Sequence, residues 1–377
     1  MGSGVDLSVT ASLGNSTLRD LLRTTQENLP WDGKFETLLK YNDYMVVNQW
    51  FRQDKVMFDG GTAIVRNVQL TENGTARMTQ PYEPAAPATA DVQGRLRANW
   101  VQATADYSVS RQEMLRNRGK AKLIDLVKSK RIACMADLAN LLEEQAWAAP
   151  SSSSDTLNAF GIPYFLVPIT GAQVTAATHG HQGTYLSGFS DCFGIDPAQT
   201  SPDASRWKSY NDVWTTTDGS IAAADVIKMT RMLRRLRFTS PYIAGLEAGT
   251  DRKTRLYAVE TVVESLEQRA RQNNDSLGAD VGMFAGIKSS AGGPLVSGIP
   301  VETLWVEVST YYAYPLIAIN HDYCYPFVME GDFFRETPDV NDRSQHDVFT
   351  TFEDIQFNFV CINRQRAGGV ISYVAAA

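Results

Sequence analysis

The feature that most constrains the fold is the stretch from Ser110 to Pro150, which we interpret as one long helix. Ser110 and Glu113 form an S-x-x-E capping box, in which each side chain can bond a backbone N–H that a helix start leaves free. Pro150 and the serines after it end the pattern. Such a helix is roughly 55 Å long at about 1.5 Å per residue, which predicts a strut. Its apolar stripe comprises Ile124, Val127, Cys134, Leu138 and Leu141.

The residues before this helix predict an extended hairpin. One strand is predicted over Thr62 to Thr71, after the turn at Asp59-Gly60-Gly61, and a second over Arg95 to Ala105. Prolines at 81, 84 and 87 mark the tip between them. A two-stranded ribbon is not stable alone in water, so the hairpin either folds back on its own domain or lies over a neighbouring subunit. The apolar face of the second strand comprises Leu96, Ala98 and Trp100, and its polar face comprises Arg95, Arg97 and Asn99.

The remaining pattern indicates an α+β protein without the regular alternation of a doubly wound sheet. Residues 1–30 are small and polar and indicate an arm that becomes ordered against a partner. A helix is predicted after Ser220, ending at Ser240-Pro241, and another over Leu256 to Ala270. A strand-rich segment is expected to begin at Phe160 to Tyr164. Further strands are predicted over Ile299 to Val308, Pro315 to Asn320, Tyr325 to Met329 and Val348 to Cys361.

Composition limits the function. The chain has 377 residues, 44% hydrophobic and 20% charged, which is typical of a folded protein with a sizeable core. A formal charge of −7 argues against broad neutralisation of nucleic-acid phosphates. Local basic groups remain, because the second predicted helix ends with Arg231, Arg234, Arg235 and Arg237. That cluster suits a helix dipole or a solvated face, or else phosphate or an acidic neighbour.

The chain shows little catalytic chemistry. Nucleotide-binding, hydrolase and metalloprotease motifs do not occur, and we predict no catalytic, cofactor-binding or metal site, no cofactor and no enzyme activity. His179 and His181 precede Cys192 at a spacing that matches no metal ligand set, so a surface pair in a loop is expected. The four cysteines lie far apart and indicate buried, reduced thiols rather than a disulfide framework. No apolar run approaches the roughly 18 residues of a membrane span.

The order of these segments resembles that of the major capsid proteins of tailed bacteriophages, which have the Hong Kong 97-type fold. The resemblance runs from about Trp31 onward and depends on order more than on any single motif. The motifs that carry it, besides the hairpin and the long helix, are Phe160-Gly161-Ile162-Pro163-Tyr164, Arg206-Trp207, the helix from Val226 to Arg237, Gln272-Asn273-Asn274-Asp275-Ser276-Leu277-Gly278, Gly298-Ile299-Pro300-Val301 and Asn363-Arg364-Gln365-Arg366.

The resemblance implies a division of the chain. It gives an N-terminal arm and the start of the peripheral (P) domain in residues 1–55, and the hairpin called the E-loop in 56–105. The spine helix of the P domain then occupies 106–150. The axial (A) domain, with a loop-rich insertion, covers most of 151–315. P-domain strands follow in 316–360, and 361–377 return to the A domain.

The resemblance also implies a function. The chain would self-assemble into pentamers and hexamers of an icosahedral shell around double-stranded DNA, and it would be found in the virion after assembly in the host bacterial cytoplasm. Partners would include a portal, a scaffolding protein encoded separately because Met1 leaves no room for a leading segment, and a decoration protein. Alternatives are an encapsulin-like or gene-transfer-agent shell, or a metal-dependent enzyme. The expected inter-subunit contacts are Arg66, Arg77, Tyr82, Glu83, Arg95 and Arg97.

Some members of this family link subunits covalently through an E-loop lysine and an asparagine of the next subunit. The present chain has no lysine between Asp59 and Trp100, and its basic residues there are arginines, whose guanidinium is a poor nucleophile. Lys55 lies at the base of the hairpin, far from the tip. The sequence therefore predicts a shell without covalent links between subunits.

Overall fold

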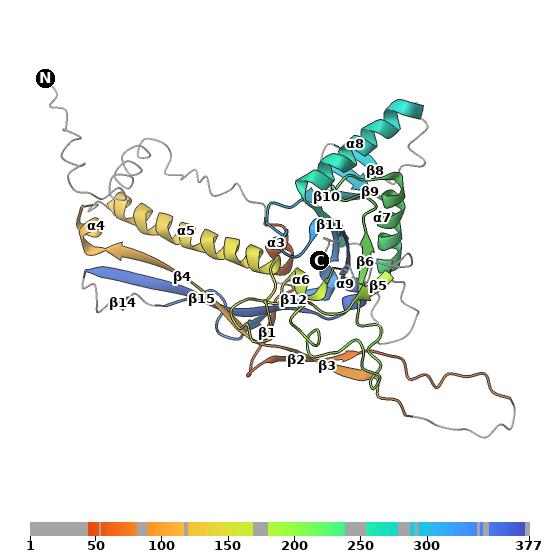
Figure 1. Ribbon diagram of the computed structural model, residues 1–377. Helices are drawn as coiled ribbons and strands as arrows, with labels where there is room; N and C mark the ends of the chain where they lie inside the picture. Colours follow the sequence, from red (N-terminus) through yellow and green to blue (C-terminus); the bar gives the residue numbers. More distant parts are fainter. Residues whose placement is uncertain are drawn as a thin grey trace. The chain divides into compact units, whose positions relative to one another are not determined.

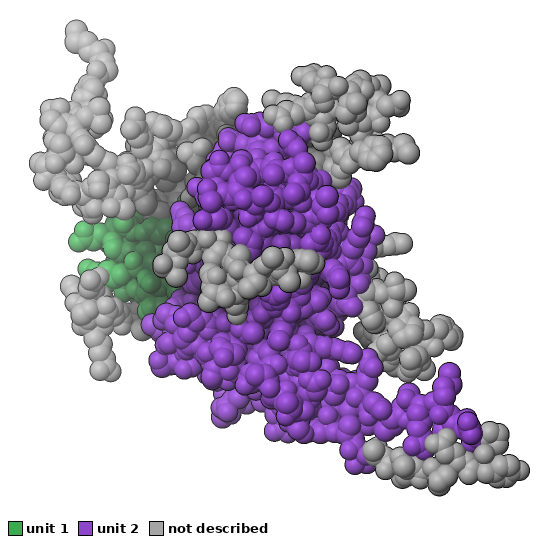
Figure 2. Space-filling view, turned by 45° about the vertical axis from the view of Figure 1, so that its right-hand side comes forward, with its two compact units in different colours: residues 1–43, 103–141, 331–355 green, residues 44–102, 142–330, 356–377 purple. Residues whose placement is uncertain are grey.

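The computed structural model describes residues 44–52, 54–80, 89–116, 120–168, 180–237, 254–277, 287–290, 293–337, 340–341 and 347–373 (Figure 1). The chain divides into two compact units, which Figure 2 distinguishes by colour. Unit 1 comprises 1–43, 103–141 and 331–355; unit 2 comprises 44–102, 142–330 and 356–377. The arm predicted in residues 1–30, with most of the apolar patch after it, lies outside the described residues.

An eight-stranded mixed sheet forms the centre of unit 2. Its middle strand β7 lies between antiparallel β11 and parallel β10, so both of its edges are paired. Such a strand is buried on both faces, which explains the complete burial of Leu256, Tyr257 and Ala258. In spatial order the strands are β5 (Gly180–Gly183), β6 (Ser209–Val213), β16 (Gly368–Tyr373), β11 (Ala313–Asn320), β7 (Thr254–Ala258), β10 (Ile299–Thr303), β9 (Gly293–Val296) and β8 (Ile287–Ser290).

Two helices pack on this sheet and share one apolar core with it (Figure 1). Helix α7 (Ala223–Leu236) lies over β6 and β16, and α8 (Glu260–Leu277) lies over β8, β9 and β10. Their inward residues meet Leu256, Val301, Leu316 and Ile371 of the strands. The helix side of this core comprises Met229, Met232, Leu233, Leu236, Val262, Val263 and Leu266.

Both helix starts differ from the sequence expectation. Helix α7 begins after Ala222, not Ser220, because the Asp225 carboxylate accepts the Ala222 N–H at 3.0 Å and supplies the cap. The helix predicted over Leu256 to Ala270 was wrong at its start, since Leu256 belongs to β7 and α8 begins only at Glu260. The apolar spacing of Leu256 and Val259 fits a helix, but pairing with two strands determines the structure of Leu256.

Further strands and short helices complete unit 2. Strand β12 (Cys324–Met329) pairs in parallel with β1 (Met57–Asp59), and antiparallel with the second half of β15 (Val348–Cys361), whose predicted limits are confirmed. The strand-rich start expected at Phe160 is instead the helical turn α6 (Ile162–Phe165). The other short helices are α3 (Val47–Trp50), η4 (His321–Tyr323) and α9 (Arg364–Ala367).

Unit 1 contains the beginning of the predicted strut. The capping box is confirmed: Glu113 N–H donates to Ser110 Oγ at 3.2 Å, and Ser110 N–H donates to Glu113 Oε2 at 3.4 Å. The predicted helix is present as α4 (Arg111–Arg116) and α5 (Lys120–Ala146), and the expected continuity between them falls on residues 117–119, which lie outside the described residues. α5 ends before Pro150, in the part of the chain assigned to unit 2. Strand β13 (Arg335–Glu336) and strand β14 (Val340–Asn341) pair with the first half of β15.

Candidate assembly surfaces

The predicted hairpin has a short regular base. Strand β2 (Ile64–Gln69) pairs antiparallel with β3 (Gln93–Ala98). The second predicted strand is interrupted, and its continuation is β4 (Val101–Ser110). At the interruption, Asn358 Nδ2 donates to the Asn99 carbonyl at 2.6 Å, and Trp100 Nε1 donates to the Gly61 carbonyl at 3.0 Å. Side chains distant in the sequence therefore hold the bend, so the local pattern could not show it.

The base of the hairpin packs on its own unit. Arg97 N–H donates to the Phe193 carbonyl at 2.9 Å. Gly94 faces Leu70 and Ile195 so closely that an added Cβ would displace Leu70. An exposed ion pair of 3.0 Å joins Arg206 to Glu72. Of the two alternatives for the hairpin, folding back on the same domain therefore holds for its base.

The chain beyond β2 differs from the base of the hairpin in its exposure to solvent. Residues 72–80 are exposed and form neither helix nor strand, and the Met78 side chain is 100% exposed. They continue away from the β2–β3 ladder in Figure 1. A single exposed methionine is ordinary on a protein surface, so the feature that distinguishes this stretch is the exposure of all of its residues.

Four of the six expected inter-subunit residues are described, and they lie in three settings. Arg66 is bound within its own unit, 3.3 Å from Asp59 and above the Phe327 ring at 5.1 Å. Arg77 is exposed in the stretch of residues 72–80. Arg95 and Arg97 are exposed on β3, on the face opposite buried Leu96 and Ala98, which confirms the predicted alternation. Tyr82 and Glu83 lie outside the described residues.

A buried polar cluster lies beneath the sheet ends of unit 2. Trp50 Nε1 donates to His321 Nδ1 at 3.0 Å, and His321 Nε2 lies 2.8 Å from Tyr257 Oη. Lys55 Nζ donates to the His321 carbonyl at 2.5 Å. Burial, with the nearby positive charges of Lys55 and Arg255, lowers the pKa of His321 to about 3. The imidazole is therefore neutral and has a structural role.

The closing Asn363-Arg364-Gln365-Arg366 motif also has a structural role. Arg364 is fully buried and donates to the carbonyls of Phe165 at 2.7 Å, Trp207 at 3.0 Å and Thr184. Arg366 Nη1 donates to the last carbonyls of α7, at 2.6 Å to Arg235 and 2.8 Å to Arg237. The sequence pattern alone gave no sign that one of two neighbouring arginines is buried.

Only one member of the histidine pair, His181, lies within the described residues. His181 was expected in a loop, but it lies on β5 and is partly buried. Burial, and then the charges of Arg366 and Arg235, lower the pKa of His181 to about 4. His179 lies outside the described residues. Among the described residues, no group of three or more histidine, cysteine or acidic side chains could hold a metal ion.

All four cysteines are free and buried, as the sequence predicts. Burial raises the pKa of Cys134 to about 11 and that of Cys192 to about 12. Cys324 and Cys361 lie opposite each other on β12 and β15. Buried thiols of raised pKa are poor nucleophiles.

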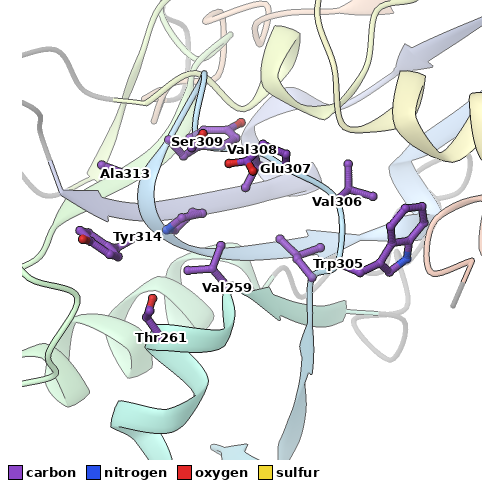
Figure 3. A pocket seen from close by; sticks show the side chains of 12 residues that line it. Val259, Thr261, Trp305, Val306, Glu307, Val308, Ser309, Ala313 and Tyr314 are labelled. Carbon is purple, nitrogen blue, oxygen red and sulfur yellow. The ribbon is translucent and has the colours of Figure 1, made fainter. Parts of the chain in front are cut away.

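An open pocket of about 480 Å³ lies at the start of α8 (Figure 3). Its walls are mainly apolar and aromatic, with Trp305 and Tyr314 partly exposed, and Glu307 contributes a carboxylate. No histidine, cysteine or lysine lines it. This lining suits contact with an apolar side chain better than acid–base chemistry.

In the described part of the chain, no helix is both long and apolar enough to span a membrane.

Comparisons with known proteins place this geometry in one fold. No family model matches the sequence, and no curated protein matches it either. Among solved structures, the cyanophage A-1(L) capsid asymmetric unit is similar with a TM-score of 0.58 and 16% identity, over 93% of this chain and 98% of that one. The capsid of a native GTA particle gives a TM-score of 0.54 and 11% identity, over 91% and 94%. The chain therefore has the Hong Kong 97-type fold of tailed-phage major capsid proteins.

Proposed function

We propose that the chain is the major capsid protein of a tailed phage, which self-assembles into pentamers and hexamers of an icosahedral shell around double-stranded DNA. The observation that carries the proposal is the fold match to the cyanophage capsid, because it covers 93% of this chain and 98% of that one.

The elements fit the parts of a capsid subunit. In this proposal the β2–β3 hairpin and its exposed continuation are the E-loop, and α5 is the spine helix of the P domain. β12 and β15 are P-domain strands. The eight-stranded sheet with α7 and α8 is the A domain. The exposed stretch of residues 72–80 supports this assignment, since it presents surface for which a monomer has no use.

The partners follow from the same proposal. The subunit binds copies of itself, with a portal, a separate scaffolding protein and a decoration protein as further partners, and it resides in the virion after assembly in the host bacterial cytoplasm. A formal charge of −7 supports DNA packaging without general phosphate binding or sequence recognition. The lysine-free hairpin supports a shell held by non-covalent contacts.

Electron microscopy of the purified full-length protein tests the proposal. We expect closed particles or capsomer rings, and a single band near the chain mass of 41.7 kDa after boiling in denaturing detergent. A protein that stays monomeric in every assembly condition contradicts the proposed function. A ladder of covalent multimers contradicts only the non-covalent shell.

A gene-transfer-agent shell is a second candidate, favoured by the similarity to the native GTA capsid. Sequencing of the DNA inside purified particles separates the two. A uniform phage genome supports the phage capsid, and random fragments of the host chromosome support the alternative.

A further inference from the structure

The outer side of α7 is basic along the flank that borders β6. Lys228 Nζ donates to the Val213 carbonyl at 2.6 Å, and Arg231 Nη1 lies 3.9 Å from Asp212 Oδ2. Val213 and Asp212 belong to β6, next to the edge strand β5. Arg235 follows Arg231 by four residues and therefore lies on the same flank, where it is exposed. We call Lys228, Arg231, Arg234 and Arg235 the basic flank.

The outer side of α8 is acidic on its opposite flank. Glu260, Glu264 and Glu267 are spaced by four and three residues, so they form one stripe along the helix. Ser265 lies about 100° further round the helix and accepts the Ile221 N–H at 2.8 Å, which marks the side facing the start of α7. The acidic stripe therefore faces away from α7, toward the β8 edge of the sheet. We call these three glutamates the acidic flank.

Unit 2 therefore has opposite charges at opposite edges of one helical layer. α7 lies on the β5–β6 side and α8 on the β10–β9–β8 side of the same sheet face. Arg234, Arg235, Glu260 and Glu264 are exposed, and none of them forms an ion pair within the described residues. Ile227, which is 61% exposed, lies among the outward residues of α7. Helix dipoles favour charges only in the first and last turns, so they do not account for Glu264.

We propose that the basic flank of α7 in one copy docks against the acidic flank of α8 in the next copy. A head-to-tail contact between two different faces forms a ring when the rotation between copies closes, whereas a two-fold contact of this edge would place the arginines of α7 against each other. A nucleic-acid phosphate would explain the arginines and leave the glutamates without a role. This inference rests on the proposed shell function and assigns the A-domain contact within a capsomer.

Charge reversal in the full-length chain tests the contact. The basic-reversed variant is Arg234→Glu with Arg235→Glu, and the acid-reversed variant is Glu260→Lys with Glu264→Lys. Like charges then face each other, so the assembled fraction, measured by sedimentation velocity and electron microscopy, should fall by about tenfold or more in each. The four-fold variant carries both reversals and should recover assembly to within about twofold of wild type, because the pairing is exchanged rather than lost.

Arg52→Glu with Lys128→Glu is the matched control, since both residues are exposed and the net charge changes as in the basic-reversed variant. It should assemble normally. If both reversed variants assemble like wild type, or the four-fold variant stays unassembled, the contact is wrong while wild-type particles still uphold the shell function. A basic-reversed variant that assembles but loses binding to double-stranded DNA would assign α7 to DNA instead. A wild-type chain that never assembles refutes both.

Discussion

The interior of unit 2 and its exposed hairpin use polar and basic side chains in opposite ways. Arg364 and His321 are fully buried: Nε and Nη1 of Arg364 donate to carbonyls of the same unit, and both ring nitrogens of His321 bind side chains there. Arg95 and Arg97 on β3 are exposed and have no ion pair within the described residues. Interior groups that bind inside the chain determine its stability. Outward groups contribute little to stability and remain available to a neighbouring subunit, so the two regions should respond differently to mutation.

Removal of the buried guanidinium should have the largest effect. Arg364→Met leaves the carbonyls of Phe165, Thr184 and Trp207 without their donor. Each buried group left unpaired costs about 1–3 kcal/mol, so the three carbonyls together predict a loss of at least about 3 kcal/mol in the free energy of unfolding. Urea denaturation followed by circular dichroism measures it. A loss under about 1 kcal/mol would show that these carbonyls find other partners.

A close backbone approach gives the next effect. A Cβ atom on Gly161 would lie 2.6 Å or less from the carbonyl oxygens of Gln145, Ala146 and Ala148, at the end of α5. Gly161→Ala should therefore cost about 1–3 kcal/mol of stability. Gly60→Ala is the control, because a Cβ there meets nothing within 4 Å and should change little. Equal denaturation midpoints for the two variants would contradict the close packing.

The buried histidine predicts a smaller, pH-dependent effect. Because the pKa of His321 falls from about 6.5 in the unfolded chain to about 3 in the fold, the unfolded state binds more protons between these values. Stability is then complete above pH 6.5 and declines as the pH falls, by about 1 kcal/mol from pH 7 to pH 5.5. His181, whose pKa is lowered to about 4, acts in the same direction.

The comparison of wild type with His321→Gln isolates this contribution. Glutamine does not titrate, so the variant should start less stable but lose about 1 kcal/mol less than wild type over that pH range. Denaturation midpoints at the two pH values give the difference. Identical pH dependence in both proteins would show that His321 is not the responsible group.

Reversal of the hairpin charges should have the smallest effect on stability. Arg95→Glu with Arg97→Glu changes two exposed side chains, so the free energy of unfolding should stay within about 0.5 kcal/mol of wild type. If these residues contact a neighbouring subunit, particle formation should nevertheless fall. Electron microscopy beside urea denaturation tests both parts. Normal particles would show that Arg95 and Arg97 are not inter-subunit contacts. A clear loss of stability would show that these exposed residues, like the buried ones, stabilise the fold.

Local patterns predicted the parts of the fold that local physics determines. The capping box at Ser110 and the limits of β15 are confirmed. The alternation of Arg95 and Arg97 with buried Leu96 is confirmed too. What failed depends on distant partners. Leu256 fits a helix but pairs with β11 and β10.

The candidate surfaces follow the same rule. A pattern of alternate residues identifies the outward arginines of β3, because a strand alone fixes which side chains share a face. The sequence signal for the acidic flank of α8 was present, because Glu260, Glu264 and Glu267 already lie on one face of the helix predicted over Leu256 to Ala270. Its relation to α7 depends on the strand order of the sheet, which no local sequence pattern contains.

The burial of every thiol has a practical consequence for measurement. Cys134, Cys192, Cys324 and Cys361 are all buried, so maleimide reagents should label the folded chain slowly. Thr79→Cys, in the exposed stretch, would then be the one fast-reacting thiol of each subunit. A fluorophore attached there would report the distance from the hairpin to a neighbouring copy while particles form, without prior removal of any native cysteine.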